Sequence, residues 1–186
     1  MINWTSNIVN AGRTAHYSPL KELNILKPKE IGMEIVPIGT TNIQYEGIFD
    51  DQKFYNFAKD SLQSNGYKVS ENKYVQFGPN YHIEWSANKL IDDYMAYRIK
   101  FVLDYRNMTE TNAMKDGKPV KVKTGTVQVT MTSDLLLDYL DKWSTGISKL
   151  VRPIYDKMNA AQIDQRKRTF ENDIQNIKNT LQSHFA

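Results

Sequence analysis

The spacing of apolar residues divides the chain into segments with a strand period and segments with a helix period. Between residues 42 and 49, Ile43 and Tyr45 alternate with polar neighbours, which predicts a half-buried strand. From residue 51 to about 64 the apolar positions return every three or four residues, as on one side of a helix. An aspartate at 50 or 51 can cap the start of this helix, and Asn65 followed by Gly66 can end it.

Strand periodicity dominates the middle of the chain. Its clearest example lies between residues 94 and 105, where every second residue is apolar. Trp85 and Phe101 fall on the apolar sides of neighbouring segments, so both are predicted to face the core. The predicted strands cover residues 67–70, 73–77, 81–87, 94–105 and 120–132, with a polar loop at 107–119.

The last of these strands changes its alternation part of the way along. Val120 and Val122 have one parity, whereas Val127 and Val129 have the other. A bulge near Gly125 would bring both pairs to the same face of the sheet.

The pattern becomes helical after residue 133. One apolar stripe runs from Ile147 to Met158, with Pro153 as a predicted kink. A second segment, from about 160 to 184, carries Phe170, Ile174, Ile177 and Leu181 at coiled-coil spacing. Because this seam is short, we expect a helical hairpin or an oligomer contact there.

Residues 1–40 have no sustained period and contain Pro19, Pro28 and Pro37. We predict an extended N-terminal arm, with one short helix near 19–25 that starts at Ser18. The arm carries too many apolar residues for a solvated tail, so it should pack on its own core or on a neighbour. The expected division is therefore an arm at 1–40, an α+β core domain at 41–158 and a C-terminal amphipathic helix at 159–186.

Together these elements predict an α+β fold. We expect a mainly antiparallel sheet built as a β-α-β-meander, with the C-terminal helices packed on its apolar face and the arm outside. A chain of 186 residues is long enough for one such core.

Composition narrows the class of protein. There are no cysteines, which removes disulfides and thiolate chemistry and favours a cytoplasmic location. We expect no membrane span and no secretion signal, because no apolar run is long enough and the N-terminus lacks a basic and an apolar region. The net charge of +3 permits a polyanionic partner without requiring one.

Catalytic motifs are not recognisable. His16, His82 and His184 have no second ligand or nucleophile at a familiar spacing. Aspartates cluster at 92–93 and at 134–141, but both clusters fall at predicted element ends, where acids cap helices. The nine glycines form no phosphate-binding fingerprint. We therefore expect no catalytic residue, no metal, no cofactor and no enzymatic activity.

One group of basic and aromatic residues has two interpretations. If their strands lie side by side, these residues could form a platform on which bases stack and phosphates are neutralised; the alternative is a solvated outer sheet face. The candidate nucleic-acid face consists of Tyr94, Arg98, Lys100, Lys121 and Lys123.

The succession of core motifs resembles a family of small uncharacterised archaeal proteins. The resemblance covers about residues 42–158 and rests on diffuse motifs, among them Ile83 to Ala87, Tyr97 to Lys100, Gly125 to Val129 and Tyr155 to Lys157. It implies the same order of elements and an archaeal source. It implies no activity.

The function that these features favour is a non-catalytic structural or interaction protein, a subunit of a homo-oligomer or larger assembly. The alternative is an RNA or single-stranded nucleic-acid binding module that uses the basic aromatic face. The candidate protein interface comprises apolar residues of the arm and the C-terminal helix: Ile2, Trp4, Leu20, Leu23, Phe170, Ile174, Ile177 and Leu181.

Overall fold

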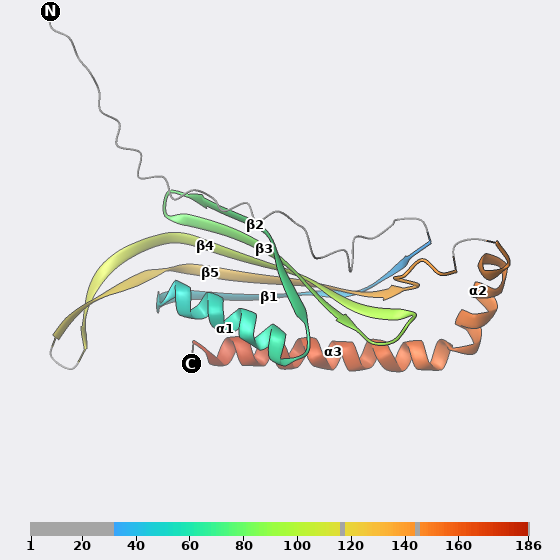
Figure 1. Cartoon of the computed structure of the whole chain (residues 1–186). Helices are drawn as coiled ribbons and strands as arrows, with labels where there is room; N and C mark the ends of the chain where they lie inside the picture. Colours follow the sequence, from blue (N-terminus) through green and yellow to red (C-terminus); the bar gives the residue numbers. More distant parts are fainter. Residues whose placement is uncertain (1–31, 116–117, 144–145, 186) are drawn as a thin grey trace, which may run out of the picture.

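The fold is a five-stranded antiparallel sheet with helices packed on one face, which confirms the predicted α+β class (Figure 1). The computed structural model describes residues 32–115, 118–143 and 146–185, and for residues 113–115 and 118–121 the backbone only. The elements are β1 (Glu34–Phe49), α1 (Asp51–Ser64), β2 (Lys68–Phe77), β3 (Asn80–Leu90), β4 (Met95–Lys115), β5 (Lys118–Leu137), α2 (Gly146–Met158) and α3 (Ala160–Ser183). The predicted helix near 19–25 lies outside the described residues.

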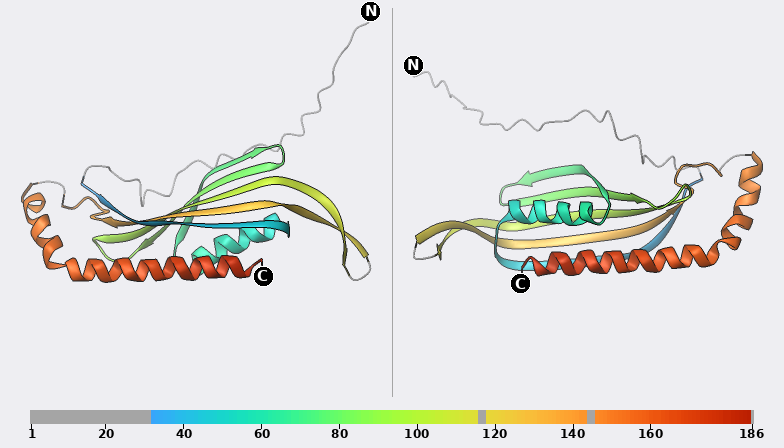
Figure 2. Two further views of the ribbon diagram at one scale, coloured as in Figure 1. Left: turned by 180° about the vertical axis from the view of Figure 1, so that it is seen from behind. Right: turned by 60° about the horizontal axis from the view of Figure 1, so that its bottom comes forward.

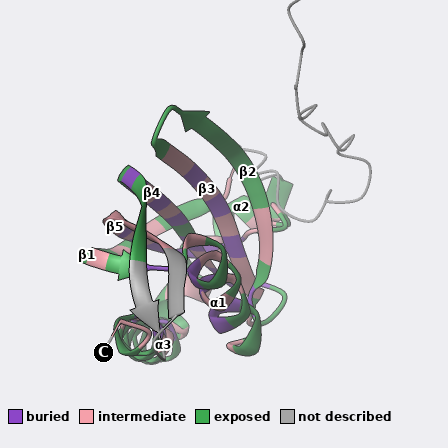
Figure 3. Cartoon of the chain, turned by 90° about the vertical axis from the view of Figure 1, so that its left-hand side faces the viewer, coloured by how far each residue is buried: buried purple, intermediate pink, exposed green. Residues whose placement is uncertain are grey.

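The strands are ordered β1-β5-β4-β3-β2, so four consecutive strands form a meander and β1 joins it beside β5. Figure 2 shows α1 and α3 on the same side of the sheet, with α3 running along β1. In Figure 3 the sheet bends around α1, so that one of its faces forms the inner side of the bend. We call this inner side the helix face and the opposite side the open face.

The helix face carries the core, as the alternation in β3 and β4 predicts. Odd-numbered residues from Met95 to Tyr105 are buried, and their even-numbered neighbours from Arg98 to Asp104 are not. Trp85 and Phe101 pair across β3 and β4, and their rings stack at 5.3 Å between centroids. Both side chains are almost fully buried, so their predicted placement is confirmed.

The C-terminal helix α3 is part of this core. Phe170 stacks on Tyr97 of β4 with the ring centroids 4.2 Å apart, and the Tyr97 hydroxyl donates to the carbonyl of Arg166. Ile174, Ile177 and Leu181 continue the same buried stripe. The heptad spacing therefore reflects packing on a sheet within one chain, because a sheet accepts the same apolar stripe as a second helix.

Local signals set the ends of α1 as predicted. The Asp50 side chain caps the helix by accepting from the backbone NH of Lys53 at 3.0 Å. At the other end, Gly66 takes a left-handed conformation with φ of 84°. Phe54, Ala58 and Leu62 face the core between these caps.

Two predicted breaks are continuous strand in the structure. The predicted polar loop at 107–119 belongs mainly to β4 and β5, which extend to Lys115 and from Lys118. The bulge predicted near Gly125 lies on the other strand of the pair. The extra residue is on β4, between Arg106 and Thr109, and Gly125 of β5 lies opposite it. The absence of a side chain at Gly125 accommodates the Met108 side chain, which lies against it.

The predicted turn at residues 71–72 is instead an irregularity inside β2. Glu71 pairs with Trp85 and Lys73 with Glu84, so Asn72 is an extra residue in the ladder. Strand β1 begins earlier in the chain than the predicted strand at 42–49. It starts at Glu34, so residues 34–40 belong to the sheet and not to the predicted arm.

Candidate functional site

Helix α2 presents an apolar face to solvent. None of its residues is buried. Five large apolar side chains follow one stripe of the helix and are exposed by 40 to 80 %: Ile147, Leu150, Val151, Ile154 and Met158. An amphipathic helix normally buries such a stripe against its own fold. We call these five residues the α2 apolar face.

The opposite side of α2 is fixed to the rest of the protein by Arg152. This guanidinium donates to the backbone carbonyl of Gly32, lies 3.2 Å from the Glu34 carboxylate and lies 3.6 Å from that of Asp156. It also donates to the Tyr94 hydroxyl at 3.3 Å. Because Arg152 is largely enclosed by these partners, α2 is held with its polar side inward and its apolar side outward.

Aromatic packing supports the same junction. The Tyr94 ring meets Tyr155 of α2 edge to face at 5.1 Å, and Trp143 lies 4.7 Å from Tyr155. The buried Asp138 carboxylate accepts the backbone NH groups of Lys142 and Trp143, which fixes the turn before α2. The α2 apolar face is therefore presented by a supported helix, which Figure 1 shows turning away from α3 beyond the end of the sheet.

The predicted nucleic-acid face is not assembled. Tyr94 is 5 % exposed, and its hydroxyl donates to Asp156, so no base can stack on it without opening the junction. Arg98 lies on the open face, where it pairs with Asp134 directly across the strands at 2.6 Å. Lys123 reaches Asp51 at the start of α1, at 2.8 Å.

Among the four candidates whose side chains the structure describes, only Lys100 has the exposed, open-face position that the platform interpretation requires. The side chain of Lys121 lies outside the described residues. Burial and the Asp156 hydrogen bond raise the pKa of the Tyr94 phenol, and the hydrogen bond to Asp51 raises the pKa of Lys123. Both groups thus keep their usual charge state inside these contacts.

The predicted protein interface is corrected in its C-terminal half. Phe170, Ile174, Ile177 and Leu181 are buried in the protein's own core, so they are not available to a partner. The arm residues of that prediction, Ile2, Trp4, Leu20 and Leu23, lie outside the described residues. Sequence analysis assigned the stripe from Ile147 to Met158 to the core, whereas the structure leaves it exposed.

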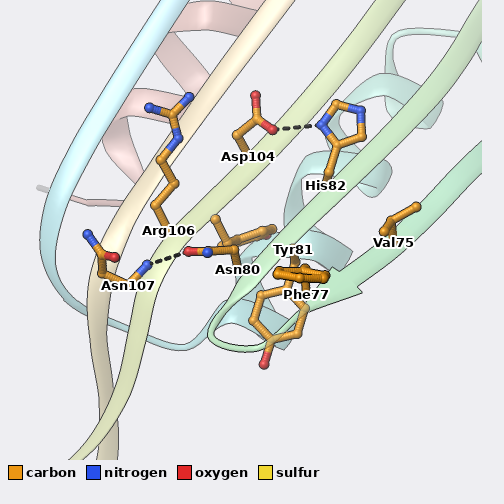
Figure 4. A pocket seen from close by; sticks show the side chains of 9 residues that line it. Val75, Phe77, Asn80, Tyr81, His82, Asp104, Arg106 and Asn107 are labelled. Atoms are coloured by element: carbon orange, nitrogen blue, oxygen red, sulfur yellow. Dashed lines mark hydrogen bonds and ion pairs between the residues drawn. The ribbon is translucent and has the colours of Figure 1, made fainter.

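A shallow pocket of about 370 Å³ lies at the turn between β2 and β3 (Figure 4). At its edge, His82 lies opposite Asp104 in the ladder, and its Nδ1 is 2.7 Å from Asp104 Oδ1. Its Nε2 is 2.7 Å from Glu84 Oε1 on the same strand face. The hydrogen bond to Asp104 and, to a smaller extent, the one to Glu84 raise the pKa of His82.

A second pocket of about 290 Å³ lies between α1 and the strands β2 to β4, on the helix face. Its lining includes four tyrosines and two acids: Tyr55, Tyr74, Tyr81, Tyr105, Asp51 and Glu71. We call it the tyrosine pocket. Sequence analysis missed it because its residues come from four elements, and because Glu71 was assigned to a turn.

In the described part of the chain, no group of three or more histidine and acidic side chains is placed to hold a metal ion. Among the same residues, no helix is both long and apolar enough to cross a bilayer.

Comparison with known proteins gives no match: no family model fits the sequence, and neither a curated protein nor a solved structure matches it. A function for this chain has to be inferred from its own residues.

Proposed function

We propose that this protein is a non-catalytic interaction protein, a subunit of a homo-oligomer. In this proposal the α2 apolar face of one copy binds the N-terminal arm of another. The observation that supports it is the exposed stripe on a helix whose polar side is already anchored. Contiguous apolar surface of this kind usually marks an interface.

The arm suits the α2 apolar face in chemistry and in position. It carries Leu20 and Leu23, three residues apart in a segment predicted to be helical, and a short amphipathic helix can lie along an apolar stripe. Arg152 holds the carbonyl of Gly32, so the part of the arm before residue 32 starts beside α2.

That starting point favours exchange between copies. Arg152 lies on the polar side of α2, so Gly32 is held on the side of its own helix that is opposite the α2 apolar face, which is a constraint on contact within one copy. The α2 of a neighbouring copy offers the same face without that constraint. A reciprocal exchange would also give the closed symmetry that is commonest among homo-oligomers.

A cytoplasmic location and membership of the archaeal family are parts of the same proposal. The first is supported by the lack of cysteine, and the second by the motifs between residues 42 and 158.

Light scattering of the full chain tests the proposal. We expect a mass above the 21.6 kDa of one chain, rising with concentration. The double variant Leu150→Gln/Ile154→Gln should be monomeric, because it replaces the centre of the α2 apolar face with polar groups. Leu20→Gln/Leu23→Gln should be monomeric for the same reason on the arm.

The matched control is Lys149→Gln/Lys157→Gln, which changes two exposed residues of the same helix outside the apolar stripe. It should keep the mass of the unaltered chain. A chain that is monomeric at every concentration would overturn the proposal, as would a mass that neither leucine-containing double variant changes.

A further inference from the structure

The tyrosine pocket has the composition of a cation-binding cage. Tyr81 and Tyr105 meet with their ring planes at 89°, so they form two walls at a right angle. Tyr55 comes from α1 on the side facing them, and Tyr74 comes from the edge strand β2. The negative π faces of aromatic rings attract cations, and several rings around one cavity do so together.

The bulge in β2 is what brings the acid and the outer tyrosine together. Glu71 and Tyr74 have opposite parity, so a regular strand would send them to opposite faces of the sheet. The extra residue Asn72 shifts the register, and Glu71 then pairs with Trp85 while Tyr74 pairs with Ile83. Both partners belong to the helix face, so Glu71 and Tyr74 line the same pocket.

The Glu71 carboxylate is exposed, and no described cation pairs with it. Its Oε2 accepts hydrogen bonds from the Tyr55 hydroxyl at 2.6 Å and from Trp85 Nε1 at 3.3 Å, and both donors are neutral. These bonds fix the carboxylate in place without neutralising it. The second acid, Asp51, is already paired with Lys123 at 2.8 Å.

Burial, more than the nearby acids, raises the pKa values of two of these tyrosines. Burial first, and then the hydrogen bond to Glu71, raise the pKa of Tyr55. Burial also raises the pKa of Tyr74, with smaller contributions from Tyr81, Asp51 and Glu71. Both phenols therefore stay protonated: Tyr55 donates to Glu71, and the rings of Tyr55 and Tyr74 offer neutral π surfaces to a cation.

We propose that the tyrosine pocket binds an organic ammonium ion with a short aliphatic body, with its charge against Glu71 and its alkyl part against the tyrosine rings. A purely apolar ligand would leave Glu71 facing it without compensation. An anion would be repelled by the same carboxylate. The volume of about 290 Å³ leaves room for a small amine but not for a large cofactor.

This site lies between α1 and the strands β2 to β4, whereas the proposed assembly uses α2 and the arm. Its test is therefore independent of oligomerisation.

The probe is n-butylammonium, with butan-1-ol as its uncharged counterpart, titrated into the full chain while the tyrosine ring signals are followed by NMR. We expect saturable shifts of the ring signals of Tyr55, Tyr74, Tyr81 and Tyr105 with the ammonium. Glu71→Gln keeps an acceptor for Tyr55 and Trp85 but removes the charge, so it should weaken binding about tenfold. Tyr74→Leu should weaken it about two- to fivefold, the contribution of one cation–π contact at an exposed site.

Glu84→Gln is the matched control, because it removes one half-exposed carboxylate from the open face of the neighbouring strand β3. It should leave the affinity unchanged. Equal shifts with butan-1-ol would overturn the proposal and indicate an apolar crevice only. An equal loss of affinity in Glu84→Gln, or no loss in Glu71→Gln, would overturn it by showing diffuse attraction to the whole surface.

Discussion

Phe101 shows how the contribution of a strand residue to stability depends on the face of the sheet on which it lies. Its ring is fully buried against Trp85, whereas the next residue back along β4, Lys100, lies exposed on the open face. Phe101→Ala should lower the free energy of unfolding by about 3 to 5 kcal/mol, because it removes a large core side chain and leaves a cavity. Lys100→Ala should change it by less than about 0.5 kcal/mol. Urea denaturation of both variants checks the difference, and equal midpoints would contradict the assignment of faces.

His82 gives the sheet a pH-dependent contact. The hydrogen bonds to Asp104 and Glu84 raise its pKa above the ordinary value of 6.5, so protonated His82 is bound more strongly in the folded state. Its contribution is complete below the unfolded pKa and disappears as pH rises through the folded pKa. Between about pH 5.5 and pH 8.5, the unaltered chain should therefore lose more stability than His82→Gln. Urea midpoints at both values check this, and parallel losses in the two proteins would show that His82 is not responsible.

The sequence correctly predicted the sheet face of residues whose environment depends only on the alternation of apolar and polar positions. Trp85 and Phe101 were placed correctly because period-two patterning fixes the face of each strand position. Tyr94 and Lys123 were not, because their partners lie on other elements: Asp156 on α2 and Asp51 on α1. Nothing in the local spacing reports contacts of that range.

At the scale of an element, Gly125 marks the place where β4 and β5 accommodate an extra residue. A Cβ there would lie 2.6 Å from Met108 Sδ and 2.9 Å from the backbone oxygen of Arg106. Gly125→Ala should lower stability by about 1 to 3 kcal/mol, because the carbonyl cannot move without distorting the irregularity. Gly39→Ala is the control, since a Cβ at Gly39 meets nothing within 4 Å. Thermal unfolding compares the two, and similar melting temperatures would mean that the strands adjust freely.

The elements themselves were predicted unevenly for a physical reason. Capping residues and an apolar stripe predicted α1, and an apolar stripe alone predicted α3, since both signals are local. The extension of the β4–β5 hairpin was missed because its outer half is polar, and hydrophobic alternation is the main signal for a strand. The backbone ladder nevertheless continues there, from Thr109 opposite Thr124 to Lys115 opposite Lys118.

For the whole molecule, the question is which of the apolar helix stripes is buried against the sheet. Both C-terminal segments have an apolar stripe, but the helix face is covered by α1 and α3, and α2 lies beyond the end of the sheet. The sequence indicated that some apolar surface exceeds what one sheet covers. It did not indicate which helix would carry the excess, because that depends on where the chain turns at Asn159.

The position of β1 in the sheet has a consequence for how the chain reaches this fold. Of the strands that the structure describes, β1 is synthesised first and pairs with β5 alone, and Asn42 meets Thr130 across 88 positions of sequence. On the ribosome, β1 must therefore wait as an unpaired strand while the β2–β4 meander emerges and forms. Pairings over such distances close slowly, since the entropy of the intervening loop is lost before the contact forms. Because α3 packs along β1 and follows the whole sheet in the chain, the contacts between them form only after all five strands have been made.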